Sequence, residues 1–111
     1  MDTLWKSRKV VIVGAGAVGS TFAYALAQRG VADEICLTDV NRDFAAGQVL
    51  DLAHGLPFYP SVQIRLGENS DYANAQVVVV TAGAKQSPGE SRLNLLQKNA
   101  AMVESIVDEM A

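Results

Sequence analysis

The chain has 111 residues, half of which are hydrophobic, and it carries a formal net charge of -3. This length allows a single domain with its own core, and the acidic balance argues against nucleic-acid or anionic-membrane partners, which bind basic surfaces. Because no apolar run approaches the ~20 residues of a membrane helix and no signal-peptide core is visible, we expect a cytoplasmic protein.

Short apolar runs alternate with segments whose apolar residues recur every three or four positions, which predicts alternating strands and helices. In chain order, the expected elements are a strand at Lys9–Val13, a helix at Ala17–Arg29, a strand at Glu34–Thr38, a helix at Arg42–His54, a strand at Val62–Leu66, a polar turn at Asn69–Asn74, a strand at Gln76–Thr81 and a helix at Leu93–Met110.

The residues that flank these helices are typical of helix ends. Asn41 and Ser91 are expected N-caps of the second and third helices, and Gly30 and Gly55 end the first and second. The apolar residues that recur along the first helix are Val18, Phe22 and Leu26. One face of the last helix carries Leu93, Leu96, Ala100, Val103, Val107 and Met110.

The element order predicts an α/β fold, a doubly wound parallel sheet with helices on both faces. The fourth strand is apolar throughout, which is typical of a central strand. After the last helix no further strand is present to pair with it, and natural proteins avoid exposed edges. We therefore expect a sheet truncated after four strands, which makes the chain a piece of a larger protein.

Two expectations concern single residue types. Cys36 is the sole cysteine and lies in an apolar run, so it is expected to be a buried thiol in a reducing compartment. The clustered positive charges of Lys6, Arg8 and Lys9 are expected to form a solvated N-terminal arm.

The segment Gly14–Gly19 has G-x-G-x-x-G spacing between the first strand and the first helix. Gly14 permits a tight turn, Gly16 allows a pyrophosphate to approach the backbone, and Gly19 lets the helix pack closely on the strand. The N-terminus of the helix attracts phosphates. The motif predicts a dinucleotide site, and the alternative is a glycine-rich turn without a ligand.

Asp39 ends the second strand, about 20 positions after Gly19, where dinucleotide-binding proteins carry an acidic residue. A carboxylate there can accept hydrogen bonds from both hydroxyls of an adenine ribose, and it repels a 2′-phosphate. Val40 follows instead of an arginine, so NAD is favoured over NADP, although the nearby Arg42 keeps NADP open. The alternative role of Asp39 is that of a turn residue before the second helix.

The loop 83–92 is longer than the usual two to six residues between a strand and a helix, and long ordered loops are usually functional. Arg92 can polarise a substrate carbonyl when such a loop closes, and the alternative is that it starts the last helix in solvent. Gln86 can touch a substrate side chain without adding charge. His54, the sole histidine, lies away from the crevice and is expected to be structural, and no metal-ligand spacing occurs.

With these motifs, the sequence resembles the family of L-lactate and malate dehydrogenases, and above all its bacterial L-lactate dehydrogenases. The resemblance rests on VVIVGAGAVGSTFAYAL, LTDV, DLAHGLPF and VVVVTAGAKQSPGESRLNLLQKN. It implies a Rossmann-type fold in which residues 1–111 form part of an NAD-binding domain, including the substrate-closing loop 83–92, with the catalytic domain absent.

The resemblance also implies roles for individual residues. Arg92 would polarise the reacting carbonyl and bind substrate. Gln86, where malate dehydrogenases have arginine, would select a monocarboxylate, and Asn69 stands where relatives often have a tyrosine. The implied cofactor-binding residues are Gly14, Gly16, Val18, Gly19, Asp39, Gly83, Ala84 and Ser105, with no metal ligand.

Taken together, the resemblance implies the N-terminal part of an NAD-dependent L-lactate dehydrogenase of glycolysis, with lactate and pyruvate as substrates. Relatives associate through the second helix, which implies a homo-oligomer of the full-length protein, specifically a homotetramer. The 111-residue chain alone is expected to be inactive, because the family's catalytic histidine and carboxylate-binding arginine lie further along. The alternatives are a malate or other 2-hydroxy-acid dehydrogenase, a non-catalytic nucleotide-binding fragment and an assembly fragment.

Overall fold

A computed structural model describes residues 8–55, 61–81 and 88–110. In chain order its elements are β1 (Lys9–Val13), α1 (Ala17–Arg29), β2 (Glu34–Thr38), α2 (Arg42–Ala53), β3 (Gln63–Leu66), η3 (Asn69–Asn74), β4 (Val77–Val80) and α3 (Arg92–Met110). The expected bounds of the helices and strands are confirmed to within one residue at each end. The segment that was expected to be a polar turn is the 3₁₀-helix η3.

The four strands form one parallel sheet in the order β3-β2-β1-β4. Val13 at the end of β1 pairs with Thr38 of β2 and with Val80 of β4, so these strands finish at the same edge of the sheet. Despite its apolar sequence, β4 is an edge strand among the described residues, as expected for a sheet that stops after four strands. It lies at the side of the sheet, next to β1, and Val77 and Val80 are exposed because no described strand covers them.

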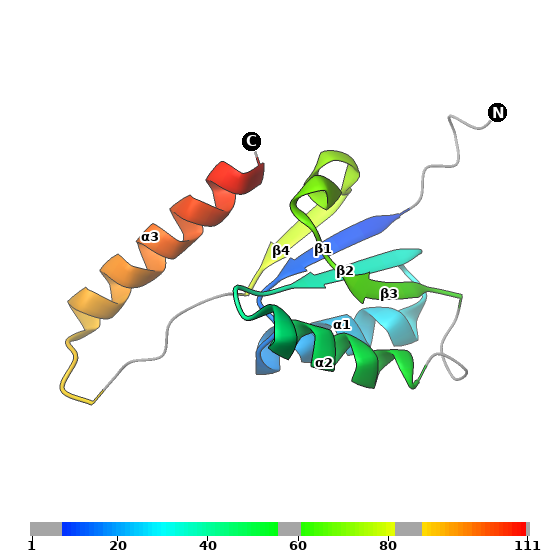
Figure 1. Cartoon of the computed structure of the whole chain (residues 1–111), viewed down its shortest axis with the longest axis horizontal. Helices are drawn as coiled ribbons and strands as arrows, with labels where there is room; N and C mark the ends of the chain where they lie inside the picture. Colours follow the sequence, from blue (N-terminus) through cyan, green and yellow to red (C-terminus); the bar gives the residue numbers. More distant parts are fainter. Residues whose placement is uncertain (1–7, 56–60, 82–87, 111) are drawn as a thin grey trace.

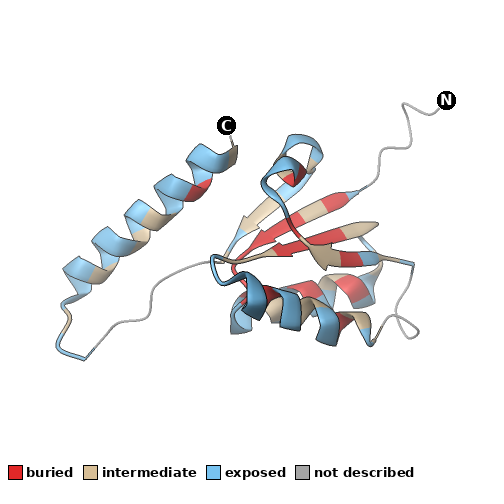
Figure 2. Ribbon diagram, viewed as in Figure 1, coloured by how far each residue is buried: buried red, intermediate tan, exposed pale blue. Residues whose placement is uncertain are grey.

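Helices cover both faces of the sheet, as expected (Figure 1). Helices α1 and α2 lie on one face over a core that includes Ile12, Ile35 and Leu37. Helix α3 lies on the other face, where Ile106 packs near Val11. Figure 2 shows that the buried residues are concentrated in β1 and β2 and on the inner sides of α1 and α2.

Only some of the expected apolar residues of α1 and α3 pack on the sheet, among them Leu26 and Met110. In α1 the buried positions are Gly19, Ala23 and Ala27, one per turn, whereas Val18 and Phe22 are exposed. Small residues at this spacing let the helix lie close to the sheet. In α3 the residues that pack against the core on this face are Met102, Ile106 and Met110. Most of the expected apolar face of α3 is exposed, namely Leu93, Leu96, Val103 and Val107.

A buried group of charges ties η3 to the sheet. Asp71 is 5% exposed, and its carboxylate forms an ion pair with Lys9 at 2.9 Å and accepts two hydrogen bonds from Arg65. Arg65 also pairs with Glu34 at 2.6 Å. These hydrogen bonds, led by those from Arg65, hold the pKa of the Asp71 carboxyl below its usual range. The expectation that Lys9 belongs to a solvated arm is therefore wrong, because Lys9 is itself 5% exposed.

The remaining composition-based expectations have mixed outcomes. Cys36 is fully buried, as expected, and burial raises the pKa of its thiol to about 11. Arg8 is exposed and forms an ion pair with Asp33 at 3.0 Å, while Lys6 lies outside the described residues. None of the described helices combines the length and the hydropathy that a membrane crossing requires.

Candidate functional site

The turn between β1 and α1 is held by hydrogen bonds to both neighbouring strands. Gly14 has a φ of 112°, a value that favours glycine. Its N–H donates to the carbonyl oxygen of Thr38 at 2.7 Å, and its own carbonyl oxygen accepts from Thr81 Oγ1 at 3.0 Å. The turn is therefore fixed at the carboxyl edge of the sheet, where α/β proteins bind their ligands.

The other two glycines of the motif face different surroundings. A Cβ atom at Gly19 would lie 1.8 Å from the carbonyl oxygen of Gly14 and 2.7 Å from Thr81 Oγ1, so the expected close packing of α1 is confirmed. A Cβ atom at Gly16 would have no neighbour within 4 Å. The same glycine is the N-cap of α1 and offers no side-chain cap to the N–H groups of the first turn.

Asp39 joins the glycine turn to the start of α2. Its Oδ2 accepts a hydrogen bond from the backbone N–H of Ala15 at 2.8 Å, and its Oδ1 accepts one from Asn41 N–H at 3.0 Å. Asn41 Oδ1 in turn accepts from Phe44 N–H at 3.0 Å, which confirms Asn41 as the N-cap of α2. The structural role foreseen for Asp39 is therefore present, and the carboxylate also borders a cleft.

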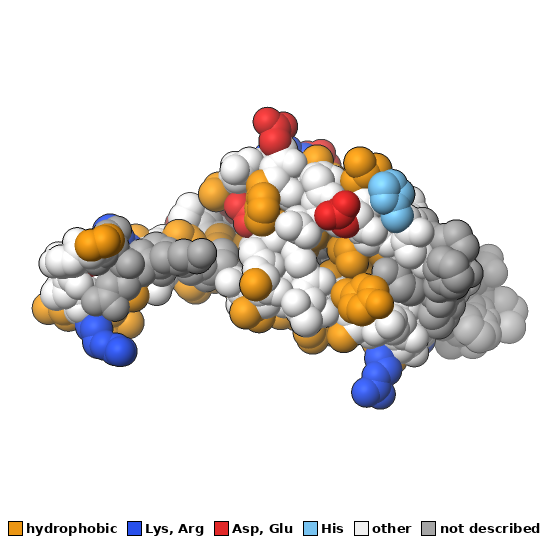
Figure 3. All heavy atoms as spheres, turned by 90° about the horizontal axis from the view of Figure 1, so that it is seen from below, with side chains coloured by type: hydrophobic (Ala, Val, Ile, Leu, Met, Phe, Trp, Pro, Cys, Tyr) orange, Lys and Arg blue, Asp and Glu red, His pale blue; other side chains and the backbone are white. Residues whose placement is uncertain are grey.

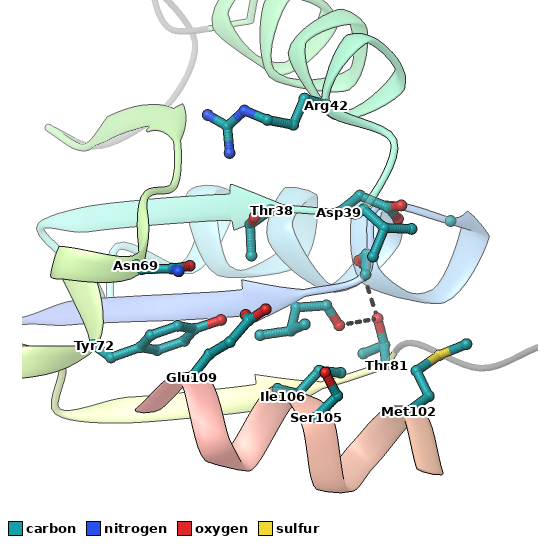
Figure 4. A pocket seen from close by; sticks show the side chains of 14 residues that line it. Thr38, Asp39, Arg42, Asn69, Tyr72, Thr81, Met102, Ser105, Ile106 and Glu109 are labelled. Atoms are coloured by element: carbon teal, nitrogen blue, oxygen red, sulfur yellow. Dashed lines mark hydrogen bonds between the residues drawn. The ribbon is translucent and has the colours of Figure 1, made fainter. Parts of the chain in front are cut away.

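This cleft has a volume of about 480 Å³ and lies between the carboxyl edge of the sheet, η3 and α3 (Figure 4). It brings together four of the predicted cofactor-binding residues, Gly14, Gly16, Asp39 and Ser105. The other residues that line it are Val13, Thr38, Val40, Arg42, Asn69, Tyr72, Thr81, Met102, Ile106 and Glu109.

The remaining predicted residues lie elsewhere or outside the described chain. Val18 is exposed and Gly19 is buried under the turn, and neither lines the cleft. Arg92 is the exposed first residue of α3, after the N-cap Ser91, whose Oγ accepts from Asn94 N–H at 3.1 Å. The predicted residues Gly83, Ala84 and Gln86 lie outside the described residues. His54 caps the C-terminus of α2 and does not line the cleft.

Tyr72 is a cleft residue that the sequence analysis missed. It projects from η3 into the cleft, with its hydroxyl toward Glu109 of α3 (Figure 4). Burial and the negative charge of Glu109 raise the pKa of the Tyr72 hydroxyl. Residues three apart in a 3₁₀-helix share a side, so a 3₁₀ assignment would have placed Tyr72 beside Asn69.

The geometry fits a dinucleotide. The open space over Gly16 and the uncapped start of α1 suit a pyrophosphate, and the Asp39 carboxylate lies at the same edge for a ribose. Within residues 8–55, 61–81 and 88–110, no group of three or more metal-ligating side chains comes together.

Comparisons with known proteins agree with this geometry. The family profile described as lactate/malate dehydrogenase, NAD binding domain, matches residues 8–111. The chain is 60% identical over 106 residues to an L-lactate dehydrogenase of Treponema denticola, a match that covers 96% of this chain and 34% of the relative. It is 50% identical over 103 residues to an L-lactate dehydrogenase of Halalkalibacterium halodurans, covering 92% and 33%.

Solved structures give the same result. The minor L-lactate dehydrogenase from Enterococcus mundtii in its ligands-bound form superposes with a TM-score of 0.91 and 44% identity, over 94% of this chain and 33% of that one. The apo malate dehydrogenase from Picrophilus torridus has a TM-score of 0.84 and 35% identity, over 95% and 34%. The chain thus spans about a third of the length of the relatives it matches.

Proposed function

We propose that this chain is the cofactor-binding part of an NAD-dependent L-lactate dehydrogenase. The chain belongs to the family of lactate/malate dehydrogenase NAD-binding domains. The observation that carries the proposal is the cleft at the carboxyl edge of the sheet, where Gly16 leaves open space beside the Asp39 carboxylate. The relatives with 60% and 50% identity are named L-lactate dehydrogenases.

Each cofactor group has a proposed partner in the cleft. The turn from Gly14 to Gly16 and the first N–H groups of α1 receive the pyrophosphate, and Asp39 accepts hydrogen bonds from the adenosine ribose. Ser105 approaches from α3. Val18, Gly19, Gly83 and Ala84 remain proposed neighbours of the cofactor. When bound, NAD supplies the acceptor for the hydride that leaves lactate.

The substrate side of the proposal rests on two residues of the loop 83–92. Arg92 polarises the carbonyl and stabilises the charge that develops on its oxygen as hydride is transferred. Gln86 contacts the substrate's side chain and brings no positive charge. Because a buried carboxylate without a counter-charge is costly, a neutral amide favours lactate and pyruvate over malate and oxaloacetate. Malate dehydrogenase remains the second candidate, since one solved malate dehydrogenase shares this fold at 35% identity.

We further propose a homo-oligomer in the cytoplasm. Figure 3 views the molecule from the side on which α1 and α2 lie, and hydrophobic side chains are visible on this face. On α2, Phe44 and Leu50 are exposed large hydrophobic residues. Such exposed apolar side chains are suited to contact a second subunit. A homotetramer of the full-length protein that associates through α2 is the proposed state, and its molar mass measured by light scattering tests it.

Calorimetric titration with ADP-ribose tests cofactor binding, using Gly16→Ala and Gly47→Ala as a matched pair. Neither added Cβ would meet an atom within 4 Å, but Gly16 lines the cleft and Gly47 does not. We expect Gly16→Ala to weaken ADP-ribose binding about tenfold, or ~1.4 kcal/mol, while Gly47→Ala binds like the unmodified protein. If the unmodified protein fails to bind ADP-ribose, or if both variants bind equally well, the proposed site is wrong.

A further inference from the structure

Arg42 is the single cation among the described residues that line the cleft. It follows Asp39 by three positions, at the start of α2. A 2′-phosphate on the adenosine ribose distinguishes NADP from NAD, and an arginine near the end of β2 is the kind of residue that accommodates this phosphate. The orientation of the Arg42 guanidinium therefore bears on which dinucleotide the cleft accepts.

The Arg42 guanidinium is held by two acceptors on the segment before η3. Nη1 donates to the carbonyl oxygen of Gly67 at 3.2 Å, and Nη2 donates to Glu68 Oε1 at 2.9 Å. Figure 4 shows the side chain extending away from Asp39, toward the side of the cleft that carries Asn69. The Arg42 guanidinium is thus paired with Glu68 and directed away from Asp39, whose carboxylate is proposed to bind the ribose.

The backbone that carries Glu68 is itself fixed to the protein interior. Its N–H donates to Asp71 Oδ2 at 2.7 Å, and its carbonyl oxygen accepts from Asp71 N–H at 3.0 Å. Asp71 is buried and bound to Lys9 and Arg65. The Glu68 side chain also accepts a hydrogen bond from the backbone N–H of Asp71, in the capping box of η3. An exposed ion pair alone contributes little, but here the carboxylate is already oriented, so less side-chain entropy opposes the pairing.

The other charges of the cleft also disfavour an additional phosphate. The carboxylates of Asp39 and Glu109 both line it, and Arg42 is already paired with Glu68. We propose that Glu68 is a specificity-determining residue, which makes the cleft select NAD over NADP by pairing Arg42 and holding its guanidinium away from the adenosine ribose. This inference rests on the proposed function, because it requires the ribose to lie beside Asp39.

Glu68→Gln tests the proposal, since the amide keeps the shape of the side chain and removes the charge that pairs with Arg42. Calorimetric titrations measure the affinities for ADP-ribose and for 2′-phospho-ADP-ribose. The readout is the affinity for the phosphorylated ligand divided by the affinity for ADP-ribose. We expect the ratio to shift about fivefold toward the phosphorylated ligand, a factor that corresponds to ~1 kcal/mol. Glu104→Gln, the same change at an exposed position of α3 outside the cleft, should leave the ratio unchanged.

The double variant Glu68→Gln/Arg42→Gln shows whether the gain acts through Arg42. The shift should disappear, and Arg42→Gln alone should not change the ratio, because its guanidinium is already withheld. A gain of affinity for one ligand is not a result that local unfolding produces. The inference is overturned if Glu68→Gln leaves the ratio unchanged, or if the double variant keeps the raised ratio. It is also overturned if Arg42→Gln alone lowers the affinity for the phosphorylated ligand.

Failure of the inference is distinguishable from failure of the proposed function. If the unmodified protein binds neither ligand, the proposed dinucleotide site is wrong. If it binds ADP-ribose and the Glu68→Gln ratio does not shift, the site stands and the role of Glu68 falls. Should Glu68→Gln fail to fold, the Arg42→Gln ratio still decides, because a fall in that ratio contradicts the proposal.

Discussion

The carboxylate of Asp39 accepts a hydrogen bond from the backbone N–H of Ala15 at 2.8 Å, so the residue that ends β2 also fixes the turn that ends β1. An asparagine can accept this bond with one oxygen, but its amide nitrogen cannot accept the second bond from Asn41 N–H. The structural contribution of Asp39 can therefore be measured together with its proposed role in binding.

We expect Asp39→Asn to lower the free energy of unfolding by about 1–2 kcal/mol. The affinity for ADP-ribose should fall about tenfold, since hydrogen bonds to a charged acceptor are stronger than those to a neutral one. Urea denaturation and calorimetric titration measure the two effects. Asp51→Asn, an exposed position on α2 outside the cleft, is the control. Unchanged affinity for ADP-ribose in Asp39→Asn would remove Asp39 from the proposed site.

Gly19→Ala should be severely destabilising, because the new Cβ would lie 1.8 Å from the backbone oxygen of Gly14 and force α1 away from the sheet. We expect a loss of at least ~3 kcal/mol of unfolding free energy. Gly47→Ala adds the same methyl group within α2, where nothing lies within 4 Å, and should stabilise by up to ~1 kcal/mol. Equal stabilities in thermal unfolding would contradict the described packing.

Acid should weaken the protein partly through Asp71. Hydrogen bonds from Arg65 hold the pKa of Asp71 below its ordinary value of 3.8, so between the two pKa values the unfolded chain binds more protons than the folded chain. The stability that Asp71 supplies is therefore fully present well above pH 4, and it is lost as pH falls through 3.8 toward the lower folded-state pKa. Urea midpoints measured between pH 3 and pH 7 follow this loss.

Asp71→Asn should remove this dependence. Breaking a buried ion pair leaves Lys9 and Arg65 without their shared partner, which costs about 3 kcal/mol at pH 7. Below pH 4 the variant should lose stability less steeply than the unmodified protein. Asp108→Asn, an exposed position on α3, serves as the control. A variant that matches the unmodified protein at every pH would show that the buried group does not stabilise the fold.

The proposed role of Gln86 is tested by substrate preference. In the full-length dehydrogenase of which this chain is proposed to be the cofactor-binding part, Gln86→Arg would supply a counter-charge for a second carboxylate. We expect the ratio of kcat/KM for oxaloacetate to that for pyruvate to rise at least about tenfold, or ~1.4 kcal/mol. If steady-state rates for the two substrates keep their ratio, Gln86 does not select the substrate's side chain.

The 111-residue chain by itself is expected to bind ADP-ribose without oxidising lactate. Hydride transfer from an alcohol also requires a base for its proton, commonly histidine, and within the described residues no histidine lines the cleft. The absorbance of NADH at excess lactate and NAD provides the assay. Steady lactate-dependent NADH formation by the purified chain would contradict this expectation.

The sequence predicts those parts of the fold that depend on local signals. The glycines at 14 and 30 mark where β1 ends and α1 ends, so the bounds of both elements follow from the sequence. The face of α1 that meets the sheet does not follow. Val18 and Phe22 carry more apolar area than Ala23, yet the close approach at Gly19 turns the small residues inward.

The candidate site is predictable to a similar extent. Gly14, Gly16 and Asp39 follow from a motif of fixed spacing, and the structure places them at one cleft. Tyr72 was missed because its position depends on η3 being a 3₁₀-helix. The pairing of Lys9 with Asp71 was missed because the two residues are far apart in the sequence, and neither carries a local signal for the other.

The inward row of Gly19, Ala23 and Ala27 along α1 restricts which sequences this fold can accept. Any larger side chain there lifts the helix, and with it the N-terminus that faces the cleft. In a saturation library the three positions should therefore retain only glycine, alanine or serine, with glycine alone at 19. The adjacent exposed positions Val18 and Phe22 should accept many replacements. The size of the side chains tolerated at each position of α1 would then reflect how closely that position approaches the sheet.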